Sequence, residues 1–278
     1  MEEIKKKIRD WWNSSPCCSK AAQLPPGTKE FYKQVDLYKD TYEPFTDGIA
    51  DYSHWKDKYV LEIGCGLGKD FSRFAANGAK ATGIDISDKS LALTVKRLEI
   101  FGLKGNFCVA DAENLPFKDN VFNLIFSWGV LHHTPNTQKA IDEIRRCLGT
   151  KGSKAIVMLY NKHSLVYLYF LFFSRAHNLL RKIKKLLLFR QWFKQSKTIP
   201  FPWECVCNKE RLAAYTDGVG NPLSKVYSRG EALNMFSKFR NINICTYEPK
   251  GSYFVKIFNF FKISEKYLGW FMVITAEK

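Results

Sequence analysis

The chain has 278 residues, 46% of them hydrophobic, and a formal net charge of +16. This length and composition suit a globular protein with a substantial core, and disorder is not expected outside the ends. The longest apolar run, Leu165–Phe173, is about half of the ~20 residues that a membrane-spanning helix needs, and the first residues lack a secretory signal, so we expect a cytoplasmic protein.

Helices are expected before the first strand, where apolar residues recur at helical spacing. The expected helices are Glu2–Trp12, Glu30–Tyr38 and Pro44–Trp55, joined by a stretch that contains Pro25, Pro26 and Gly27. We interpret residues 1–56 as an N-terminal helical cap segment.

From Tyr59 onward, short apolar runs alternate with longer helix-compatible stretches, which predicts βαβ units and a parallel sheet. The expected strands are Tyr59–Ile63, Lys80–Asp85, Asn106–Ala110, Val121–Ser127 and Lys154–Tyr160. The expected helices between them are Lys69–Ala76, Ser87–Phe101 and Thr137–Leu148. We take residues 57–160 as one core unit.

Beyond the fifth strand the alternation breaks. Leu165–Phe193 has a helical pattern and Ser196–Tyr227 is irregular, so residues 161–228 are predicted to form a lid or insertion. Ser228 and Glu231 have the spacing of a capping box that opens another helix. Asn241–Glu248 and Trp270–Ala276 are the last expected strands, within a C-terminal part of the core sheet at 229–278.

A glycine-rich turn, Gly64-Cys65-Gly66-Leu67-Gly68, follows the first expected strand. Glycine is needed where a backbone turns tightly and a ligand approaches it without meeting a Cβ. Asp85 ends the next strand about 20 residues later, where an acidic side chain accepts hydrogen bonds from the ribose of a bound nucleoside. A dinucleotide fingerprint would need a third glycine at the position of Lys69, which weakens a pyrophosphate-binding interpretation.

A third motif begins at Asp111-Ala112-Glu113, and the fourth strand then leads into the run from Trp128 to Pro135. With these motifs in this order, roughly residues 40–160 resemble the class I S-adenosylmethionine-dependent methyltransferases. Within that family the resemblance is to the small-molecule group that includes the ubiquinone and menaquinone C-methyltransferases. It implies an α/β fold: a Rossmann-like, seven-stranded, mostly parallel sheet with helices on both faces, a helical cap and an antiparallel final strand.

The resemblance also implies S-adenosyl-L-methionine as cofactor. Its expected contacts all lie at strand ends: Glu62, Gly64, Cys65, Gly66, Asp85, Ile86, Asp111, Ala112, Ser127 and Gly129. Glu62 and the glycine turn would face the methionine end, Asp85 the ribose, and Asp111 the adenine amine. Asn123 departs from the family's usual aspartate early in the fourth strand, at a scaffold position.

Methyl transfer from a sulfonium depends on positioning and desolvation, because the methyl group is already activated. A base is required only when the acceptor must first lose a proton. His132 and His133 follow the fourth strand, at the edge where open α/β sheets bind ligands, and imidazole titrates near neutral pH. We name both as candidate catalytic bases, with packing of the loop as the alternative for each.

Three classes of methyl acceptor stay open. A small molecule fits best, since the cap and the lid would stand over the strand ends and bring aromatic side chains such as Trp12. A nucleic-acid acceptor is supported only by the net positive charge. The residues after the fourth strand, His132 and His133, do not form the motifs of nucleic-acid methyltransferases. A catalytically silent cofactor-binding module is the alternative outside enzymes, and the intact Asp85 and Asp111 argue against it.

A lipid-like acceptor is the third class. Leu179, Ile183 and Leu187 share one face of an expected helix, and the basic residues between Arg181 and Lys185 share the other. We expect at most a weak, salt-sensitive contact with anionic membranes.

The cysteine spacing predicts no metal site. Cys17-Cys18 and Cys205-x-Cys207 both lack the Cys-x2-Cys spacing of zinc sites. The sequence leaves the accepting atom and the oligomeric state open.

Overall fold

The computed structural model describes residues 2–172, 175, 217–218, 220–250 and 265–278. In this part of the chain seven strands form one sheet, in the order β3-β2-β1-β4-β5-β7-β6. The strands are β1 (Tyr59–Ile63), β2 (Lys80–Asp85), β3 (Asn106–Val109), β4 (Leu124–Trp128), β5 (Lys154–Tyr160), β6 (Arg240–Tyr247) and β7 (Phe271–Glu277). Strand β7 pairs antiparallel with β5 and β6, and the other pairs are parallel. The predicted seven-stranded, mostly parallel α/β fold is confirmed.

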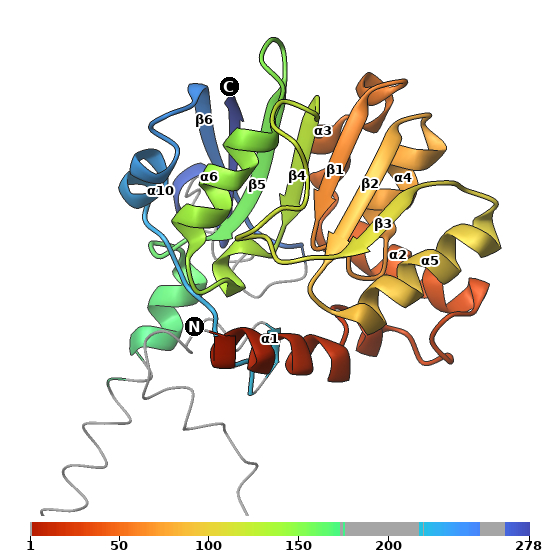
Figure 1. The fold of residues 1–278 in the computed structure, drawn as a ribbon. Helices are drawn as coiled ribbons and strands as arrows, with labels where there is room; N and C mark the ends of the chain where they lie inside the picture. Colours follow the sequence, from red (N-terminus) through yellow and green to blue (C-terminus); the bar gives the residue numbers. More distant parts are fainter. Residues whose placement is uncertain (1, 173–174, 176–216, 219, 251–264) are drawn as a thin grey trace, which may run out of the picture.

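Helices surround this sheet (Figure 1). They are α1 (Glu2–Ser14), α2 (Lys29–Tyr42), α3 (Thr46–Ala50), α4 (Lys69–Ala76), α5 (Asp88–Phe101), α6 (Thr137–Cys147), α10 (Arg229–Met235) and α12 (Glu265–Leu268), with the short turns η1 (Ser19–Ala21), η2 (Tyr52–Trp55) and η3 (Leu131–His133). Local capping explains where two of them begin. The side chain of Ser87 accepts the N–H of Ser90 at the start of α5, and Ser228 and Glu231 form the predicted capping box of α10.

The sheet is buried on both faces, as a parallel sheet requires. Successive side chains of a strand point to opposite faces. Val60 of β1 therefore packs in one apolar cluster with Phe74 of α4, while its neighbour Leu61 packs in the other with Ile144 of α6. Helices α4 and α5 contribute to the first cluster, and α6 and α10 to the second.

The strand order places a binding crevice between β1 and β4. Strands β2 and β3 follow one another on one side of β1. The chain then crosses back, and β4 and β5 lie on the other side of β1. The connections that leave β1 and β4 diverge at this switch point, where open α/β sheets bind their ligands. Helix α1 runs across the carboxyl ends of the parallel strands, next to this crevice (Figure 1).

Several predicted boundaries differ from the structure. The expected helix Pro44–Trp55 is divided into α3 and η2 by Asp51, whose φ of 43° lies in the left-handed region. The expected strand Val121–Ser127 begins only at Leu124, because the N–H groups of Val121 and Phe122 bond to the carbonyl of Cys147 at the end of α6.

Most of the expected helix Leu165–Phe193 lies outside the described residues, and only 165–172 and 175 are seen to be helical. The amphipathic pattern around Leu179 and Ile183, and nearly all of Ser196–Tyr227, also lie outside them. The membrane contact and the division at 1–56, 57–160, 161–228 and 229–278 therefore stay predictions. Among the described residues, no helix combines the length and apolarity needed to cross a bilayer.

Candidate functional site

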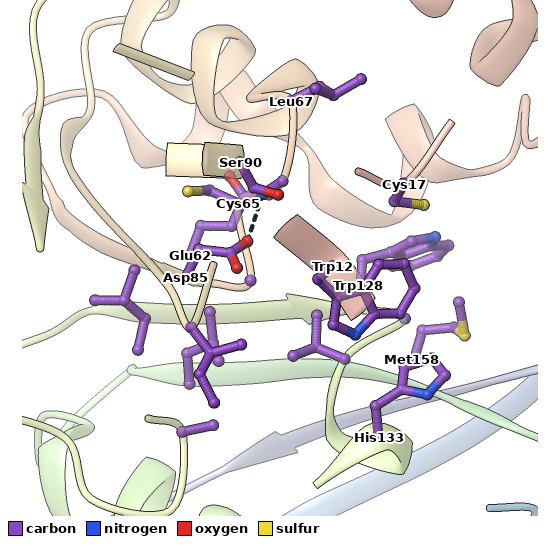
Figure 2. A pocket seen from close by; sticks show the side chains of 18 of the residues that line it. Trp12, Cys17, Glu62, Cys65, Leu67, Asp85, Ser90, Trp128, His133 and Met158 are labelled. Carbon is purple, nitrogen blue, oxygen red and sulfur yellow. Dashed lines mark hydrogen bonds between the residues drawn. The ribbon is translucent and has the colours of Figure 1, made fainter. Parts of the chain in front are cut away.

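A pocket lies at the carboxyl ends of the parallel strands, and its walls come from the segments after β1, β2, β3 and β4 and from α1 and α2. Figure 2 shows that it has two chemically different ends. Glu62 and Asp85 lie together at a polar end, while Trp12, Trp128 and Met158 gather at an aromatic end. The pocket thus offers adjoining space for a charged ligand and a flat or apolar one.

Almost all of the predicted cofactor contacts line this pocket. They are Glu62, Gly64, Cys65, Gly66, Asp85, Ile86, Asp111, Ala112 and Gly129. Ser127 does not line it. Ser127 is fully buried in β4, and its hydroxyl has no hydrogen-bond partner among the described residues. The fold therefore brings four separate predicted segments to one cavity, and their contacts with a cofactor stay a proposal.

The glycine turn after β1 adopts a backbone that other residues rarely take. Gly64, Gly66 and Gly68 have φ values of 75°, 55° and 72°. A Cβ on Gly64 would lie 2.2 Å from Cγ2 of Val130, whereas a Cβ on Gly66 would meet nothing closer than 4.0 Å. The two glycines are thus required for different reasons: close packing at Gly64, and at Gly66 a left-handed backbone beside open space.

Asp85 anchors this turn to the end of β2. Its Oδ2 accepts the N–H of Gly66 at 2.9 Å, and its Oδ1 accepts the N–H of Ser87 at 2.8 Å. Burial raises the pKa of Asp85 to about 6, although these backbone hydrogen bonds oppose the rise. Each carboxylate oxygen has a further lone pair, so Asp85 can also accept from a ligand in the pocket.

Glu62 is the least satisfied polar group of the polar end. Its side chain is 4% exposed, and its Oε2 has no hydrogen-bond partner among the described residues. Burial, with the neighbouring Asp70 next in size, raises the pKa of Glu62 well above its usual value. A buried carboxylate in a pocket wall stabilises a positively charged ligand group, because that group replaces the lost hydration.

Lys39 of α2 brings a positive charge to the same end. Its Nζ lies 3.8 Å from Oδ2 of Asp70. The other carboxylate oxygen of Asp70, Oδ1, accepts a hydrogen bond from the hydroxyl of Tyr52 at 2.7 Å. Burial lowers the pKa of Lys39, but Glu43 and Asp70 outweigh it and raise the pKa well above its usual value. The polar end thus holds a cationic Lys39 beside Glu62, whose carboxyl group a ligand cation would ionise, and this pair suits a zwitterionic ligand.

Polar contacts at both ends of helix α1 hold it against the pocket wall that contains Asp85 and Asp111. The Nζ of Lys5 lies 2.5 Å from Oδ2 of Asp111 and 2.8 Å from Oε2 of Glu113. At the other end of the helix, Asn13 donates to Asp88 and accepts from the hydroxyl of Ser87. Lys5 was not predicted as a site residue, and it engages the carboxylate expected to receive an adenine amine.

Tryptophan and tyrosine side chains are held in place at the aromatic end. The Nε1 of Trp128 donates to Oε2 of Glu43 at 2.8 Å. Tyr160 stacks on Trp270 with ring centroids 4.3 Å apart, and Trp12 meets His133 edge-on at 5.2 Å. Because these rings are fixed by partners, the aromatic end is a preformed wall.

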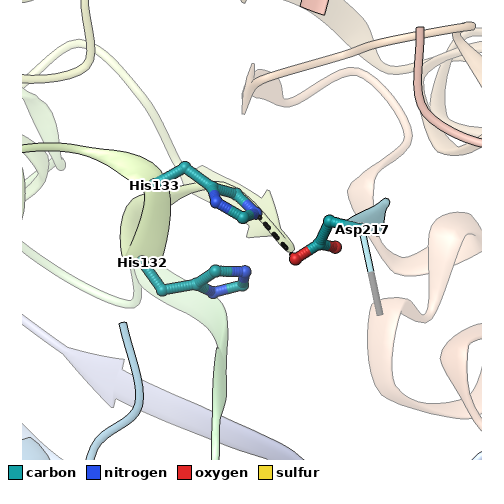
Figure 3. Close-up of side chains that lie close together, drawn as sticks. All are labelled: His132, His133 and Asp217. Carbon is teal, nitrogen blue, oxygen red and sulfur yellow. Dashed lines mark ion pairs between the residues drawn. The ribbon is translucent and has the colours of Figure 1, made fainter. Parts of the chain in front are cut away.

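The two histidines lie in different places relative to this wall. His133 lines the pocket, whereas His132 does not and is 0% exposed. The Nδ1 of His133 lies 2.7 Å from the carbonyl oxygen of Leu223, and its Nε2 lies 3.6 Å from Oδ2 of Asp217 (Figure 3). Burial lowers the pKa of His132 well below its usual value. Direct contact with an acceptor is thus open to His133 and not to His132 as it lies here.

Some of the cysteines line the pocket, and others lie outside the described residues. Cys17 and Cys18 line the pocket with their sulfur atoms 3.5 Å apart, and Cys65 lies in the glycine turn. Cys205 and Cys207 lie outside the described residues.

Comparison with known proteins relates part of the chain to a family of methyltransferase domains. Residues 60–152 match the profile of a family described as a methyltransferase domain. The chain is 39% identical over 118 residues to an uncharacterized protein of Methanocaldococcus jannaschii, a match that covers 42% of this chain and 48% of that protein. It is 30% identical over 161 residues to a ubiquinone biosynthesis O-methyltransferase of Coxiella burnetii, covering 58% and 61%. The chain thus spans about half to three fifths of the length of these curated relatives.

A solved structure agrees in fold. Geranyl diphosphate C-methyltransferase from Streptomyces coelicolor A3(2) superposes with a TM-score of 0.55, covering 99% of this chain and 98% of that chain at 13% identity. At that identity the likeness concerns the fold alone. Residues 60–152 thus match a methyltransferase domain, and the sheet order and the glycine turn between β1 and α4 agree with the class I, S-adenosylmethionine-dependent type expected from the sequence.

Proposed function

We propose that this protein transfers the methyl group of S-adenosylmethionine to a small-molecule acceptor bound at the aromatic end of the pocket. The observation that carries the proposal is the single pocket that joins the polar end at Glu62 and Asp85 to the aromatic end at Trp12, Trp128 and Met158. A cofactor and an acceptor must meet in one cavity for direct transfer.

The residues of the polar end fit the cofactor. The unpartnered Oε2 of Glu62 suits its ammonium group, and the positive charge of Lys39 suits its carboxylate. We assign Asp85 to the ribose hydroxyls, and Asp111 with the neighbouring Ala112 amide to the adenine edge, because all three residues line the pocket. When bound, S-adenosylmethionine supplies a methyl group on a sulfonium that is already activated.

The chain's own contribution is to orient the acceptor and exclude water. Trp128 is fixed by Glu43, and Tyr160 by its stacking on Trp270, so an acceptor meets a rigid apolar surface. Such positioning and desolvation supply most of the rate enhancement in direct transfer. His133 remains a candidate base for an acceptor that must lose a proton.

The accepting atom stays open. Relatives named for their reactions include a phosphoethanolamine N-methyltransferase, a ubiquinone biosynthesis O-methyltransferase and a sterol 4-C-methyltransferase. These names span nitrogen, oxygen and carbon acceptors, and the quinone-like subgroup is one candidate among them. A nucleic-acid acceptor is supported only by the net positive charge. The case for a membrane lipid as acceptor depends on residues 179–187, which lie outside the described residues. Incubation with labelled S-adenosylmethionine and a fractionated extract tests transfer directly, and identifying the labelled product names the acceptor.

Asp85→Ala is expected to weaken S-adenosylhomocysteine binding by ~1.5–3 kcal/mol, the scale of hydrogen bonds to a charged group. The substitution removes the carboxylate that also accepts from Gly66. Isothermal titration calorimetry measures the change, and Asp142→Ala, a half-exposed carboxylate on α6 outside the pocket, is the matched control. Tighter binding of NAD than of S-adenosylhomocysteine by the wild type would contradict the assignment of the cofactor.

Cofactor affinity is expected to fall as the pH drops through about 6. The pKa of Asp85 is about 6 because of burial, and the ribose hydroxyls donate best to the charged carboxylate. Protonation of Asp85 therefore competes with binding below that pH. The measurement is the affinity for S-adenosylhomocysteine between about pH 5 and 8, across the titration range set by this pKa. The same profile in Asp85→Asn should lose this inflection, and an unchanged profile would assign it to another group.

A further inference from the structure

Three side chains with metal-binding atoms converge beside the aromatic end of the pocket. They are His132 and His133 of η3 and Asp217, and Figure 3 shows their side chains facing one another. One ligand atom from each lies within 4.8 Å of the other two. His132 is 0% exposed, His133 is 4% exposed, and the side chain of Asp217 is 10% exposed. His133 and Asp217 line the pocket, so the cluster borders the proposed acceptor space.

The hydrogen bonds of His133 fix its protonation pattern. Its Nδ1 lies 2.7 Å from the carbonyl oxygen of Leu223, and a carbonyl only accepts, so Nδ1 carries a proton. In the neutral ring Nε2 then holds a lone pair, and it faces Oδ2 of Asp217 at 3.6 Å. A lone pair and a carboxylate oxygen repel each other unless a cation lies between them. The arrangement therefore suits a proton or a metal ion between the two atoms.

His132 decides between these two cations. Neither of its ring nitrogens has a hydrogen-bond partner among the described residues, although the side chain is fully buried. A proton on His133 would satisfy the pair with Asp217, but both ring nitrogens of His132, which packs on Tyr160, would stay without a partner. A metal ion takes a lone pair from one nitrogen of each imidazole, so it uses both histidines, and His133 then serves as a ligand in place of a base.

The surroundings of the cluster resemble the outer sphere of a metal site. The hydroxyl of Tyr160 donates to Oδ1 of Asp217 at 2.6 Å, and that of Ser224 donates to Oδ2 at 3.3 Å. Metal-binding histidines commonly donate their other ring nitrogen to a backbone carbonyl, as His133 does to Leu223, and metal-binding carboxylates are themselves hydrogen-bonded. These contacts hold the ligands in orientation before an ion arrives.

We propose that His132, His133 and Asp217 bind a divalent transition-metal ion. Two imidazoles and one carboxylate suit zinc(II), and three protein ligands leave a coordination position open. Ligand atoms of a tetrahedral zinc site lie about 3.3 Å apart, so the cluster closes by up to about 1.5 Å on binding. Because His133 and Asp217 are in the pocket wall, the open position adjoins the aromatic end.

The ion also defines the acceptor class, and this part rests on the proposed function. A heteroatom that coordinates the open position is held beside Tyr160 and His133. The acceptor would then be a small molecule with a metal-binding oxygen, nitrogen or sulfur atom. A wholly hydrocarbon acceptor would gain nothing from the ion.

The test measures metal binding directly on the full chain. Protein freed of metal by a chelator is titrated with Zn²⁺, and with Co²⁺, whose visible absorption reports the ligands. About one ion per chain is expected for this three-ligand cluster. His133→Ala and Asp217→Asn should remove the Co²⁺ spectrum. Tyr160→Phe, which keeps the ring and loses the bond to Asp217, should weaken Zn²⁺ affinity ~10–100-fold.

Two control variants keep the result specific. His163→Ala removes an exposed histidine outside the pocket and should leave binding unchanged. Cys17→Ser with Cys18→Ser removes the thiols that line the same pocket and should also leave it unchanged. Circular dichroism confirms that each variant folds. Equal Zn²⁺ affinity in the wild type and in Asp217→Asn overturns the proposal, and so does loss of binding only in the cysteine variant.

Calorimetry with S-adenosylhomocysteine separates this proposal from the proposed function. Normal S-adenosylhomocysteine binding in a chain that takes up no metal overturns the metal site alone. Metal binding without any S-adenosylhomocysteine binding overturns the methyltransferase function and leaves the metal site standing.

Discussion

Gly64→Ala is expected to abolish cofactor binding and to lower the free energy of unfolding by about 2–4 kcal/mol. Gly64 has a φ of 75°, and a Cβ there would lie 2.2 Å and 2.9 Å from the two γ-carbons of Val130. Backbone strain and overpacking therefore act at the same position. The turn also carries the N–H of Gly66 that bonds to Asp85, so a shift of the turn would disturb both the proposed methionine contact and the proposed ribose contact.

Chemical denaturation and calorimetry with S-adenosylhomocysteine measure the two effects separately. Gly230→Ala is the matched control, because that glycine has no neighbour within 4 Å of an added Cβ and no positive φ. Adding Val130→Ala to Gly64→Ala removes the γ-carbon clashes and should recover part of the stability, while the φ strain remains. A Gly64→Ala protein that binds S-adenosylhomocysteine like the wild type would show that the turn does not hold the cofactor.

Glu62→Gln is expected to weaken S-adenosylhomocysteine binding by ~2–5 kcal/mol and to stabilise the ligand-free protein at neutral pH and above. The binding loss is that of a buried charge pair deprived of one partner. The gain in stability has the opposite sign because Oε2 has no hydrogen-bond partner among the described residues, so the ionised carboxylate is costly without a ligand. One substitution therefore separates folding from binding.

The pH dependence of stability follows from the direction in which folding shifts the pKa of Glu62. Burial raises the pKa of Glu62 in the folded protein above its unfolded value. Its contribution to stability is therefore complete below the unfolded pKa, and it is lost as the pH rises through the folded pKa. Glu62→Gln should flatten this decline, whereas Glu99→Gln, an exposed residue of α5 paired with Lys96, should leave it unchanged. Loss of stability in Glu62→Gln with unchanged affinity would show that the carboxylate serves the fold and not the ligand.

The sheet was predictable because its signal is local. Each parallel strand is a short apolar run, and β1, β2 and β5 have the expected bounds, as does α4 after the glycine turn. The polar end of the pocket was predictable for a related reason. Parallel strands bring their carboxyl ends to one edge, so Glu62, Asp85 and Asp111 converge without any knowledge of the loops.

The remaining residues of the pocket depend on tertiary docking. Lys5 and Lys39 lie on helices of the cap, and nothing in their local pattern shows which strand ends they reach. At the end of β4 the strand alternation decides: Trp128 lines the pocket and the preceding Ser127 does not. Asp217 contacts His133 from a distant part of the chain, and the cysteine spacings used to search for a metal site do not include either residue.

Helix α1 forms part of the pocket wall and is held there by polar contacts near both of its ends. It contributes Lys5, Ile8 and Trp12 to the pocket, and it is tied down by Lys5 at one end and by Asn13 at the other. If the protein binds S-adenosylmethionine as proposed, we expect the release of spent cofactor to depend on how fast these contacts open. Turnover would then be timed by the lifetime of a few polar contacts on one short helix, and a molecule that lengthened that lifetime would slow the enzyme without touching the methyl group.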